Sequence, residues 1–243
     1  MTPKIKLRSL RTAAVLGAAG LAASLAVAIP LASHAAHTTG HGPVATPAGP
    51  SPRPNAIAAG PVELVPGAHW KDGLWLGYPR TQSGALSAGL EYTTAVVESL
   101  DPDRLRAVLA DVLAPGERIA AGLAAAVRSD RALVGAPATG PLPAGAALVL
   151  TGRMYQLLDF NQSQAHLLLL FTMQASGPGA PDLSGKAMIL PVRLRWAVGD
   201  WKLSAWDRGP SYRSLIAPPD SASAYGEGWL DLPSAADGPG SWS

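Results

Sequence analysis

The order of apolar and polar positions divides the chain into an N-terminal apolar run, a helical region and a region of strands. Residues 13–32 carry no charge, and apolar side chains recur at helical spacing over residues 81–133. From residue 147 onward the apolar side chains alternate with a period of two, which is typical of strands with one buried face. Helices followed by strands predict an α+β fold.

Three helices are predicted between residues 81 and 133. The first covers about residues 81–100, and the second begins at Asp101-Pro102-Asp103. Asp101 can accept hydrogen bonds from free backbone N–H groups, and Pro102 suits the first helical position because an N–H there would have no helical partner. The apolar residues of the second helix follow at i, i+3, i+4, i+7 and i+8 from Leu105. A third helix is predicted over about residues 117–133.

Four strands are predicted to form an antiparallel meander, over residues 147–158, 163–174, 186–197 and 201–207. In the first strand the period of two places Leu150 and Met154 toward the helices, and Arg153 and Tyr155 on the other face. Pro191 cannot donate a hydrogen bond inside a flat strand, so a bulge or a sheet edge is expected there. The pattern therefore predicts helices packed on a curved, four-stranded antiparallel sheet.

The start of the chain indicates export or membrane anchoring. Four basic residues precede the apolar run, and the first acidic residue is Glu63. This order is typical of a signal peptide or a membrane anchor. The length of the run favours a membrane helix over residues 13–33, with residues 1–12 in the cytoplasm and the rest outside. Residues 33–36 (SHAA) offer a cleavage site, so secretion after cleavage is the alternative.

The remaining chain divides into a linker, a domain and a tail. Residues 34–61 are rich in Pro and Gly and almost uncharged, which predicts an extended linker. Residues 62–207 hold the predicted α+β domain. Residues 208–243 are predicted to be a C-terminal tail, of which Trp229 and Leu230 are expected to dock back onto the domain.

Charge and composition exclude several classes of protein. Five of the 19 Lys and Arg residues precede residue 62, which leaves 14 basic and 17 acidic residues and a net charge of −3 beyond it. This balance argues against a nucleic-acid binder, because such a protein needs a basic face. The chain has no Cys, which excludes disulfides, thiol catalysis and Cys-ligated zinc.

Two patterns that resemble ligand sites are interpreted as structural. His34, His37 and His41 would share a helix face, but the Gly and Pro residues around them oppose a helix, so no metal site is predicted. Residues 179–186 (GAPDLSGK) differ from a phosphate loop in spacing and in the Ala187 that follows.

No catalytic residue and no cofactor are predicted. Tyr155 and Asp159 are the nearest acid–base pair, but four residues along a strand separate them by ~13 Å. His166 is interpreted as a histidine of the sheet rather than a base. Trp196 and Trp201 occupy predicted core positions, which argues against carbohydrate stacking.

The outward face of the predicted sheet is the candidate partner surface. Apolar groups mixed with Arg and Tyr are typical of protein interfaces. The alternative is a solvated face that the C-terminal tail partly covers. The predicted partner face consists of Arg153, Tyr155, Leu168, Leu170, Arg193 and Arg195.

Two stretches resemble known families. Residues 77–81 (GYPRT) with residues 84–88 (GALSA) resemble a signature of uncharacterised, membrane-anchored actinobacterial proteins. Residues 196–203 (WAVGDWKL) resemble the last hairpin of that group and of the cone-shaped α+β fold of nuclear transport factor, scytalone dehydratase and ketosteroid isomerase. Scaffold subunits of type IV secretion and Gram-positive conjugation machines use this cystatin-like or nuclear-transport-factor-like cone behind one membrane helix.

The resemblance implies a membrane-anchored scaffold or accessory subunit of a secretion or conjugation apparatus. Its partners would be other envelope subunits, or a second copy of the chain, and it would not be an enzyme. Two alternatives stay open: a module that binds a small ligand or the cell wall, and an enzyme of the isomerase or dehydratase type.

Overall fold

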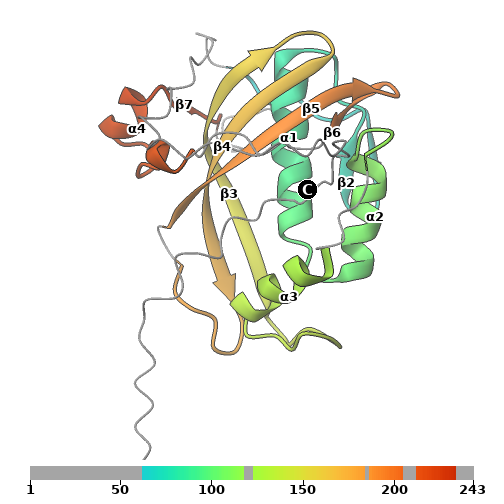
Figure 1. Ribbon diagram of the computed structural model, residues 1–243, viewed down its shortest axis with the longest axis vertical. Helices are drawn as coiled ribbons and strands as arrows, with labels where there is room; N and C mark the ends of the chain where they lie inside the picture. The colour runs from blue at the N-terminus through green and yellow to red at the C-terminus, as the bar shows by residue number, and fades with distance from the viewer. Residues whose placement is uncertain (1–61, 118–122, 184–185, 205–211, 234–243) are drawn as a thin grey trace, which may run out of the picture.

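The computed structural model describes residues 62–117, 123–183, 186–204 and 212–233 (Figure 1). The fold is α+β, and the predicted order of helices before strands is confirmed for the main sheet, whereas a short hairpin, β1 and β2, precedes the helices. The elements are β1 (His69–Lys71), β2 (Leu74–Leu76), α1 (Gln82–Val97), α2 (Pro102–Val112), α3 (Leu123–Leu133), β3 (Ala147–Phe160), β4 (Gln164–Ser176), β5 (Ala187–Ala197), β6 (Asp200–Leu203), a 3₁₀ turn (Arg213–Leu215), α4 (Ala222–Gly226) and β7 (Leu230–Asp231).

The main sheet has five antiparallel strands in the order β6-β5-β4-β3-β7, and β1 and β2 form a separate two-stranded sheet. The four predicted strands are the consecutive meander β3 to β6. The fifth strand, β7, was not predicted as a strand, because only two of its residues pair with β3. So short a run carries no alternation that a sequence pattern could reveal.

Helix α1 lies against one face of the main sheet, with α2 beside it (Figure 1). A Cβ added at Gly89 would stand 2.8 Å from the Cδ1 atom of Leu167 on β4. The glycine at this position therefore allows the backbone of α1 to approach the sheet closely. The main core forms between α1, α2 and this face of the sheet.

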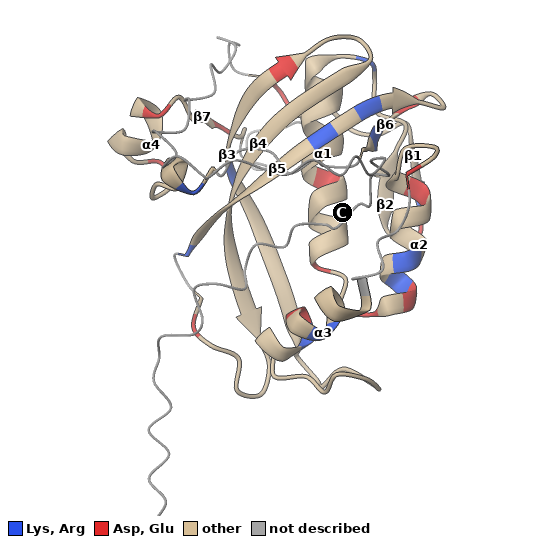
Figure 2. Cartoon of the chain, in the orientation of Figure 1, with Lys and Arg blue, Asp and Glu red and all other residues tan. Residues whose placement is uncertain are grey.

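The predicted start of α2 is confirmed. One carboxylate oxygen of Asp101 accepts hydrogen bonds from the backbone N–H groups of Asp103 and Arg104, both at 2.8 Å. Pro102 occupies the first turn, where no helical N–H is needed. Basic and acidic residues are interspersed along this helix (Figure 2).

Strand β3 contains a bulge that the sequence pattern did not reveal. The pairing of β3 with β4 shifts register between Gly152 and Met154, so Arg153 is an extra residue. Leu150 before the shift and Tyr155 after it both lie in the main core, whereas Met154 lies in a second cluster on the opposite face. The predicted faces of this strand are therefore wrong beyond the bulge, because one inserted residue exchanges the two faces.

Pro191 lies at a local sheet edge, as predicted, but not in a bulge. It pairs in regular register with Leu168 of β4, whereas β6 pairs only with Leu194–Ala197 of β5. The missing N–H of a proline costs no ladder hydrogen bond on a side where no strand pairs.

No helix among the described residues is long and apolar enough to cross a membrane. The predicted membrane segment, residues 13–33, and the predicted linker, residues 34–61, lie outside the described residues.

Candidate interaction surface

The six side chains of the predicted partner face do not form one exposed surface. Arg153 is exposed at the bulge. Tyr155 is buried on the helix side of the sheet, where its hydroxyl accepts a hydrogen bond from the backbone N–H of Val62 at 3.1 Å. Leu168 and Leu170 are fully buried on the other side.

The two remaining arginines share a face with Leu168 but are half-buried. The register of β4 and β5 places Arg193 opposite His166 and Arg195 opposite Gln164. The guanidinium of Arg195 donates a hydrogen bond to the backbone oxygen of Pro115 at 2.6 Å. The structure thus brings four of the six residues to one face of the sheet and separates Tyr155 from them.

The C-terminal segment, residues 212–232, covers this outward face (Figure 1). Within this segment, the indole N–H of Trp229 donates a hydrogen bond to the backbone oxygen of Leu215 at 3.0 Å. This bond links the two ends of the segment. Gln156 donates to the backbone oxygen of Glu227 at 2.9 Å, and Arg153 forms an ion pair with Asp220. The docking expected of Trp229 therefore occurs, and it buries the face that was predicted to bind partners. The second cluster comprises Met154, Leu168, Leu170, Tyr212, Leu215, Ala217, Ala224 and Trp229.

The two stretches that carry the family resemblance contact each other around a buried carboxylate. Asp200 accepts hydrogen bonds from the backbone N–H of Tyr78 at 2.9 Å, the hydroxyl of Tyr92 at 2.6 Å and the ammonium group of Lys202 at 2.9 Å. The indole N–H of Trp201 donates to the backbone oxygen of Pro79 at 2.9 Å. These contacts join the residues before α1 to the hairpin of β5 and β6. Both stretches therefore have a structural role in holding these two parts of the domain together.

The carboxylates of α1 that turn inward also bind backbone groups. Glu91 accepts a hydrogen bond from the N–H of Trp75 at 3.2 Å, and Glu98 accepts one from the N–H of Leu150 at 2.7 Å. Burial raises the pKa of each carboxyl group, and the backbone N–H opposes that rise. Both side chains therefore act as hydrogen-bond acceptors for backbone N–H groups of strands β2 and β3.

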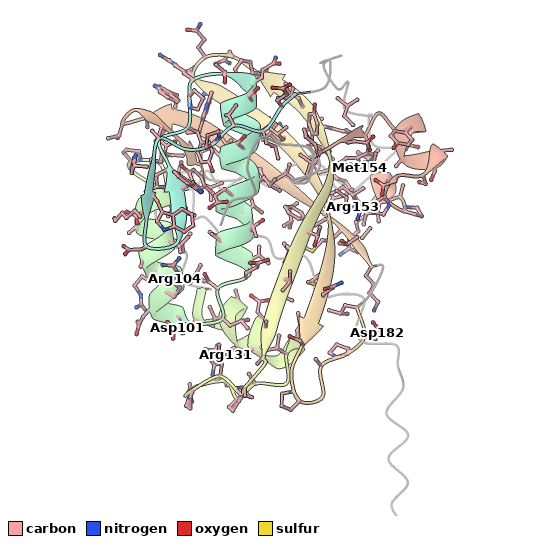
Figure 3. All side chains as sticks on the ribbon, turned by 180° about the vertical axis from the view of Figure 1, so that it is seen from behind. Asp101, Arg104, Arg131, Arg153, Met154 and Asp182 are labelled. Atoms are coloured by element: carbon pink, nitrogen blue, oxygen red, sulfur yellow. The ribbon has the colours of Figure 1, made fainter. Side chains whose placement is uncertain are left out.

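Arg131 is a buried cation with a structural role. Its guanidinium donates to the backbone oxygens of Leu100, Pro137 and Gly140 at 3.0, 2.6 and 2.6 Å. It lies where α3 meets the connection to β3 (Figure 3). One side chain thus satisfies the carbonyl of buried Leu100 and ties it to two carbonyls of the exposed connection that follows α3.

Asp130 and His166 also have a displaced pKa. Burial raises the pKa of Asp130 on α3 to about 6. Burial, with a smaller effect of Arg193, lowers the pKa of His166 to about 4, against an opposing effect of Asp159. His166 packs edge-on against Tyr212 of the C-terminal segment, with ring centres 6.5 Å apart. This environment agrees with the interpretation of His166 as a histidine of the sheet.

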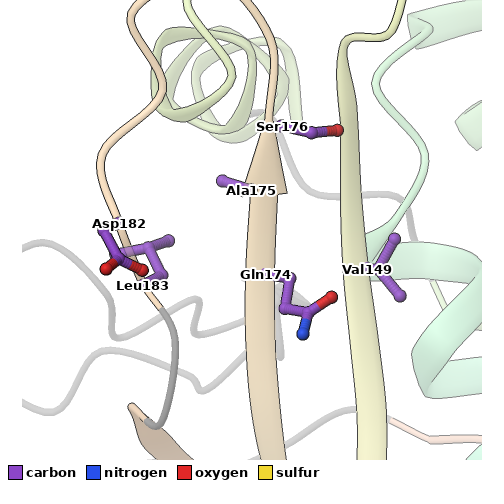
Figure 4. Close-up of a pocket in the computed structure, with 6 residues that line it drawn as sticks. All are labelled: Val149, Gln174, Ala175, Ser176, Asp182 and Leu183. Carbon is purple, nitrogen blue, oxygen red and sulfur yellow. The ribbon is translucent and has the colours of Figure 1, made fainter.

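A pocket lies between the paired ends of β3 and β4 and the connection to β5 (Figure 4). Val149 and Gln174 contribute from β3 and β4, and Asp182 and Leu183 from the connection to β5. Ser176 and Asp182 also line it, but their side chains point apart (Figure 4), and the Ser176 hydroxyl donates a hydrogen bond to the backbone oxygen of Gly145 at 2.8 Å.

The described part of the chain contains no group of three or more His, Asp or Glu side chains placed to hold a metal ion. His34, His37 and His41, the histidines weighed as ligands, lie outside the described residues.

The hairpin of β1 and β2 presents the most exposed large aromatic side chain of the described residues. Trp70 is 58% exposed, and it pairs across the hairpin with Trp75, with ring centres 5.3 Å apart and planes at 69°. Leu74 and Leu76 on the other face of the hairpin are buried. Trp70 therefore forms the outward side of an anchored hairpin, and Trp75 beside it is half-buried and packs against the main core.

Several contacts hold this hairpin rigidly on the helices. Lys71 forms an ion pair with Asp111 of α2 at 2.5 Å, and the N–H of Trp75 is bound to α1. Asp72 and Gly73 have φ angles of 50° and 80°, which is the conformation of a two-residue type I′ turn. We name the exposed side of Trp70 and Trp75 the tryptophan surface.

The sequence contained a signal for this surface. The aromatic, Gly and Pro residues of 69–80 predict an irregular or short-strand entry that packs its aromatics on the domain. The short strands form, and the packing is right for Tyr78 and Trp75 but wrong for Trp70. An Asp-Gly pair between two short apolar runs is the strongest short-range indication of a hairpin. In such a hairpin Trp70 and Trp75 lie opposite each other and point to the same side.

A family model described as "Domain of unknown function (DUF8175)" matches residues 31–227 of the chain. No curated protein and no solved structure matches it.

Proposed function

The chain belongs to the DUF8175 family, a family of domains of unknown function, and we propose that it acts through protein–protein contact outside the cytoplasmic membrane. In this proposal residues 13–33 anchor the chain, residues 34–61 form a stalk, and the α+β domain adopts a nuclear-transport-factor-like cone. The role is that of a scaffold or accessory subunit of an envelope secretion or conjugation apparatus.

The observation that carries the proposal is the tryptophan surface. Tryptophan is enriched among the residues that dominate binding energy at protein interfaces. Trp70 is more than half exposed although an ion pair, a backbone hydrogen bond and two buried leucines fix its hairpin. An exposed aromatic on a rigid hairpin loses little conformational entropy on binding, which favours a role in recognition.

The buried charges support a non-enzymatic role. Asp200, Glu91, Glu98 and Arg131 each bind backbone groups of the domain. A catalytic acid or base needs a proton-transfer partner within reach in a cleft, and these four side chains are occupied in holding strands, turns and helix ends.

The test is co-purification of full-length chain from gently solubilised, cross-linked membranes of its source. We expect the wild-type chain to recover membrane subunits or a secretion ATPase, identified by mass spectrometry, and Trp70→Ser to lose them. The matched control is Tyr225→Ser, because Tyr225 is also an exposed aromatic, at 47%, but lies on α4 away from the hairpin (Figure 1).

Circular dichroism of both variants checks that each domain is folded. Equal recovery of partners by wild type and Trp70→Ser would remove the tryptophan surface from the proposal. Recovery of the chain alone from the culture fluid, starting near Ala36, would exclude the anchored scaffold and favour the alternative of a secreted ligand-binding or cell-wall-binding module.

A further inference from the structure

The outward face of the main sheet carries a histidine beneath the C-terminal segment. His166 lies on β4, and its ring packs edge-on against Tyr212, with ring centres 6.5 Å apart. Tyr212 is buried in the second cluster together with Leu168, which lies two residues beyond His166 on the same face of β4. The C-terminal segment therefore shields the imidazole of His166 from water while it lies on the sheet.

The titratable and charged groups around this imidazole come from three other elements. The register of the sheet places His166 between Asp159 of β3 and Arg193 of β5, and Tyr212 faces it from the C-terminal segment. Arg193 is partly buried, whereas Asp159 is exposed. Burial raises the pKa of the Tyr212 hydroxyl from its ordinary value of 10.0, against an opposing effect of Arg193, so this group stays neutral in acid. A proton on His166 would thus add a second positive charge beside Arg193, beneath an apolar cover.

The cover and the protonation of His166 are linked. Burial, and to a smaller extent Arg193, lowers the pKa of His166 from 6.5 to about 4, while Asp159 opposes the shift. Departure of the segment would return the ring to water, and the pKa would rise toward 6.5. The uncovered form then binds the proton more tightly, so falling pH favours it by up to about tenfold per pH unit between 6.5 and 4. Below pH 4 both forms carry the proton, and the effect reaches its limit.

The attachment of the segment allows such a release. Strand β7 pairs with β3 over two residues, and the ion pair between Arg153 and Asp220 is exposed and contributes little. Apolar packing in the second cluster therefore supplies most of the attachment. The hydrogen bond from Trp229 to Leu215 joins the two ends of the segment, so they leave the sheet together. A short segment held in this way opens more easily than the strands beneath it.

We propose that the C-terminal segment, residues 212–232, is a proton-linked cover, which leaves the outward face of the sheet when His166 takes up a proton. Its departure exposes the apolar side chains of Met154, Leu168 and Leu170 to water. The proposal goes beyond the proposed function, because it involves neither a partner nor the tryptophan surface.

Hydrogen exchange of the purified full-length chain, read by mass spectrometry and expressed as protection factors, tests this proposal at pH 7.5, 6 and 5. The reporter is the backbone N–H of Leu232, which donates to the backbone oxygen of Arg153 at 3.0 Å when the segment lies on the sheet. We expect its protection to fall by at least about tenfold between pH 7.5 and 5, because proton uptake by His166 favours the open form. The N–H groups that join β4 to β5 should keep their protection. The series stops at pH 5, above the ordinary range of carboxyl groups.

Two substitutions remove the titrating group. His166→Gln and His166→Phe should keep the protection of Leu232 at pH 7.5 and abolish its fall at pH 5, and the second also keeps a ring against Tyr212. Arg193→Gln should reduce the fall, because it removes a positive charge beside the covered imidazole. The matched control is His69→Gln, at an exposed histidine of β1, which should behave as the wild-type chain.

Four results would each overturn the proposal. These are equal protection of Leu232 in the wild-type chain at pH 7.5 and 5, an unchanged fall in both His166 variants, loss of the fall in His69→Gln, and an equal fall in the N–H groups that join β4 to β5, which would mean that the whole domain unfolds. No partner takes part in this experiment, so its failure leaves the co-purification result intact, and the reverse also holds.

Discussion

At the scale of single residues, we expect Asp200 to contribute strongly to the stability of the domain. It is buried and binds a backbone N–H, a tyrosine hydroxyl and Lys202. Asp200→Asn would leave Lys202 without its counter-ion and replace one acceptor oxygen by a donor group. We expect a loss of about 2–4 kcal/mol in the free energy of unfolding, measured by urea denaturation.

The control for this prediction is Asp111→Asn, which breaks the exposed ion pair with Lys71. Exposed pairs contribute little, so its stability should stay close to that of the wild-type chain. Equal effects of the two substitutions would show that the contacts of Asp200 do not hold the two family stretches together.

Asp130 is a residue whose charge opposes folding. It is only 7% exposed, and burial raises its pKa to about 6, above the 3.8 of a free Asp. The folded state therefore favours the protonated carboxyl, so the contribution of this group to stability is full below pH 3.8 and is lost as the pH rises through about 6. Asp130→Asn should stabilise the chain by about 1–3 kcal/mol at pH 7.5.

This gain should be nearly constant above about pH 6 and shrink as the pH is lowered from about 6 to 4, because the buried carboxyl of the folded wild-type chain then takes up a proton and loses its charge. Urea denaturation at several pH values measures it. Asp72→Asn, in the exposed hairpin turn, serves as the matched control. A gain that is the same at pH 4 and pH 7.5 would contradict the assignment of the effect to ionisation.

At the scale of elements, the sequence predicts what depends on local chemistry. The cap at Asp101, the length of α1 and the meander β3 to β6 follow from capping preferences and from the period of the apolar residues. The faces of β3 were predicted wrongly beyond Arg153, because the only sign of the bulge is Gly152 beside it, and an isolated Gly does not say which residue is the extra one. The order Leu148, Leu150, Met154 suits either an unbroken strand or a bulged one, and only the pairing with β4 decides.

The burial of the candidate partner face also depends on a contact between segments far apart in the sequence. Leu168 and Leu170 alternate with Leu167 and Leu169, so β4 is apolar on both sides. A strand that is apolar on both faces is expected to be covered on both. The pattern thus required a cover for the outward face, but the segment that supplies it lies more than forty residues further along the chain.

The turn between β5 and β6 leads to a prediction at this scale. Val198 has φ 53° and is 84% exposed, followed by Gly199 at φ 76°. A β-branched residue is strained in this left-handed conformation, whereas Asn-Gly is the preferred pair of a type I′ turn. Val198→Asn should therefore raise the free energy of unfolding by about 1 kcal/mol, with the shift read from urea denaturation. Gly199→Ala, which adds a side chain at positive φ, should act in the opposite direction.

At the scale of the whole molecule, one sheet separates two apolar clusters. The main core lies between the sheet and the helices, and the second cluster lies between the sheet and the C-terminal segment. Strand β4 supplies alternate residues to both. Trp229 is the largest side chain of the second cluster and is fully buried, so its loss tests how far the outward face depends on the segment.

Trp229→Ala should lower the free energy of unfolding by about 3–5 kcal/mol, because it removes a large buried side chain and leaves a cavity. If the domain stays folded, the uncovered face of Met154, Leu168 and Leu170 should bind a hydrophobic dye and promote self-association, since a contiguous apolar patch is then in contact with water. Calorimetry, dye fluorescence and light scattering measure the three effects.

Ile216→Ala, in the same segment but at a side chain that is 46% exposed, should change none of them appreciably. A Trp229→Ala variant with wild-type stability and no dye binding would mean that the outward face does not need its cover, and a partner could then reach the residues first predicted to bind one.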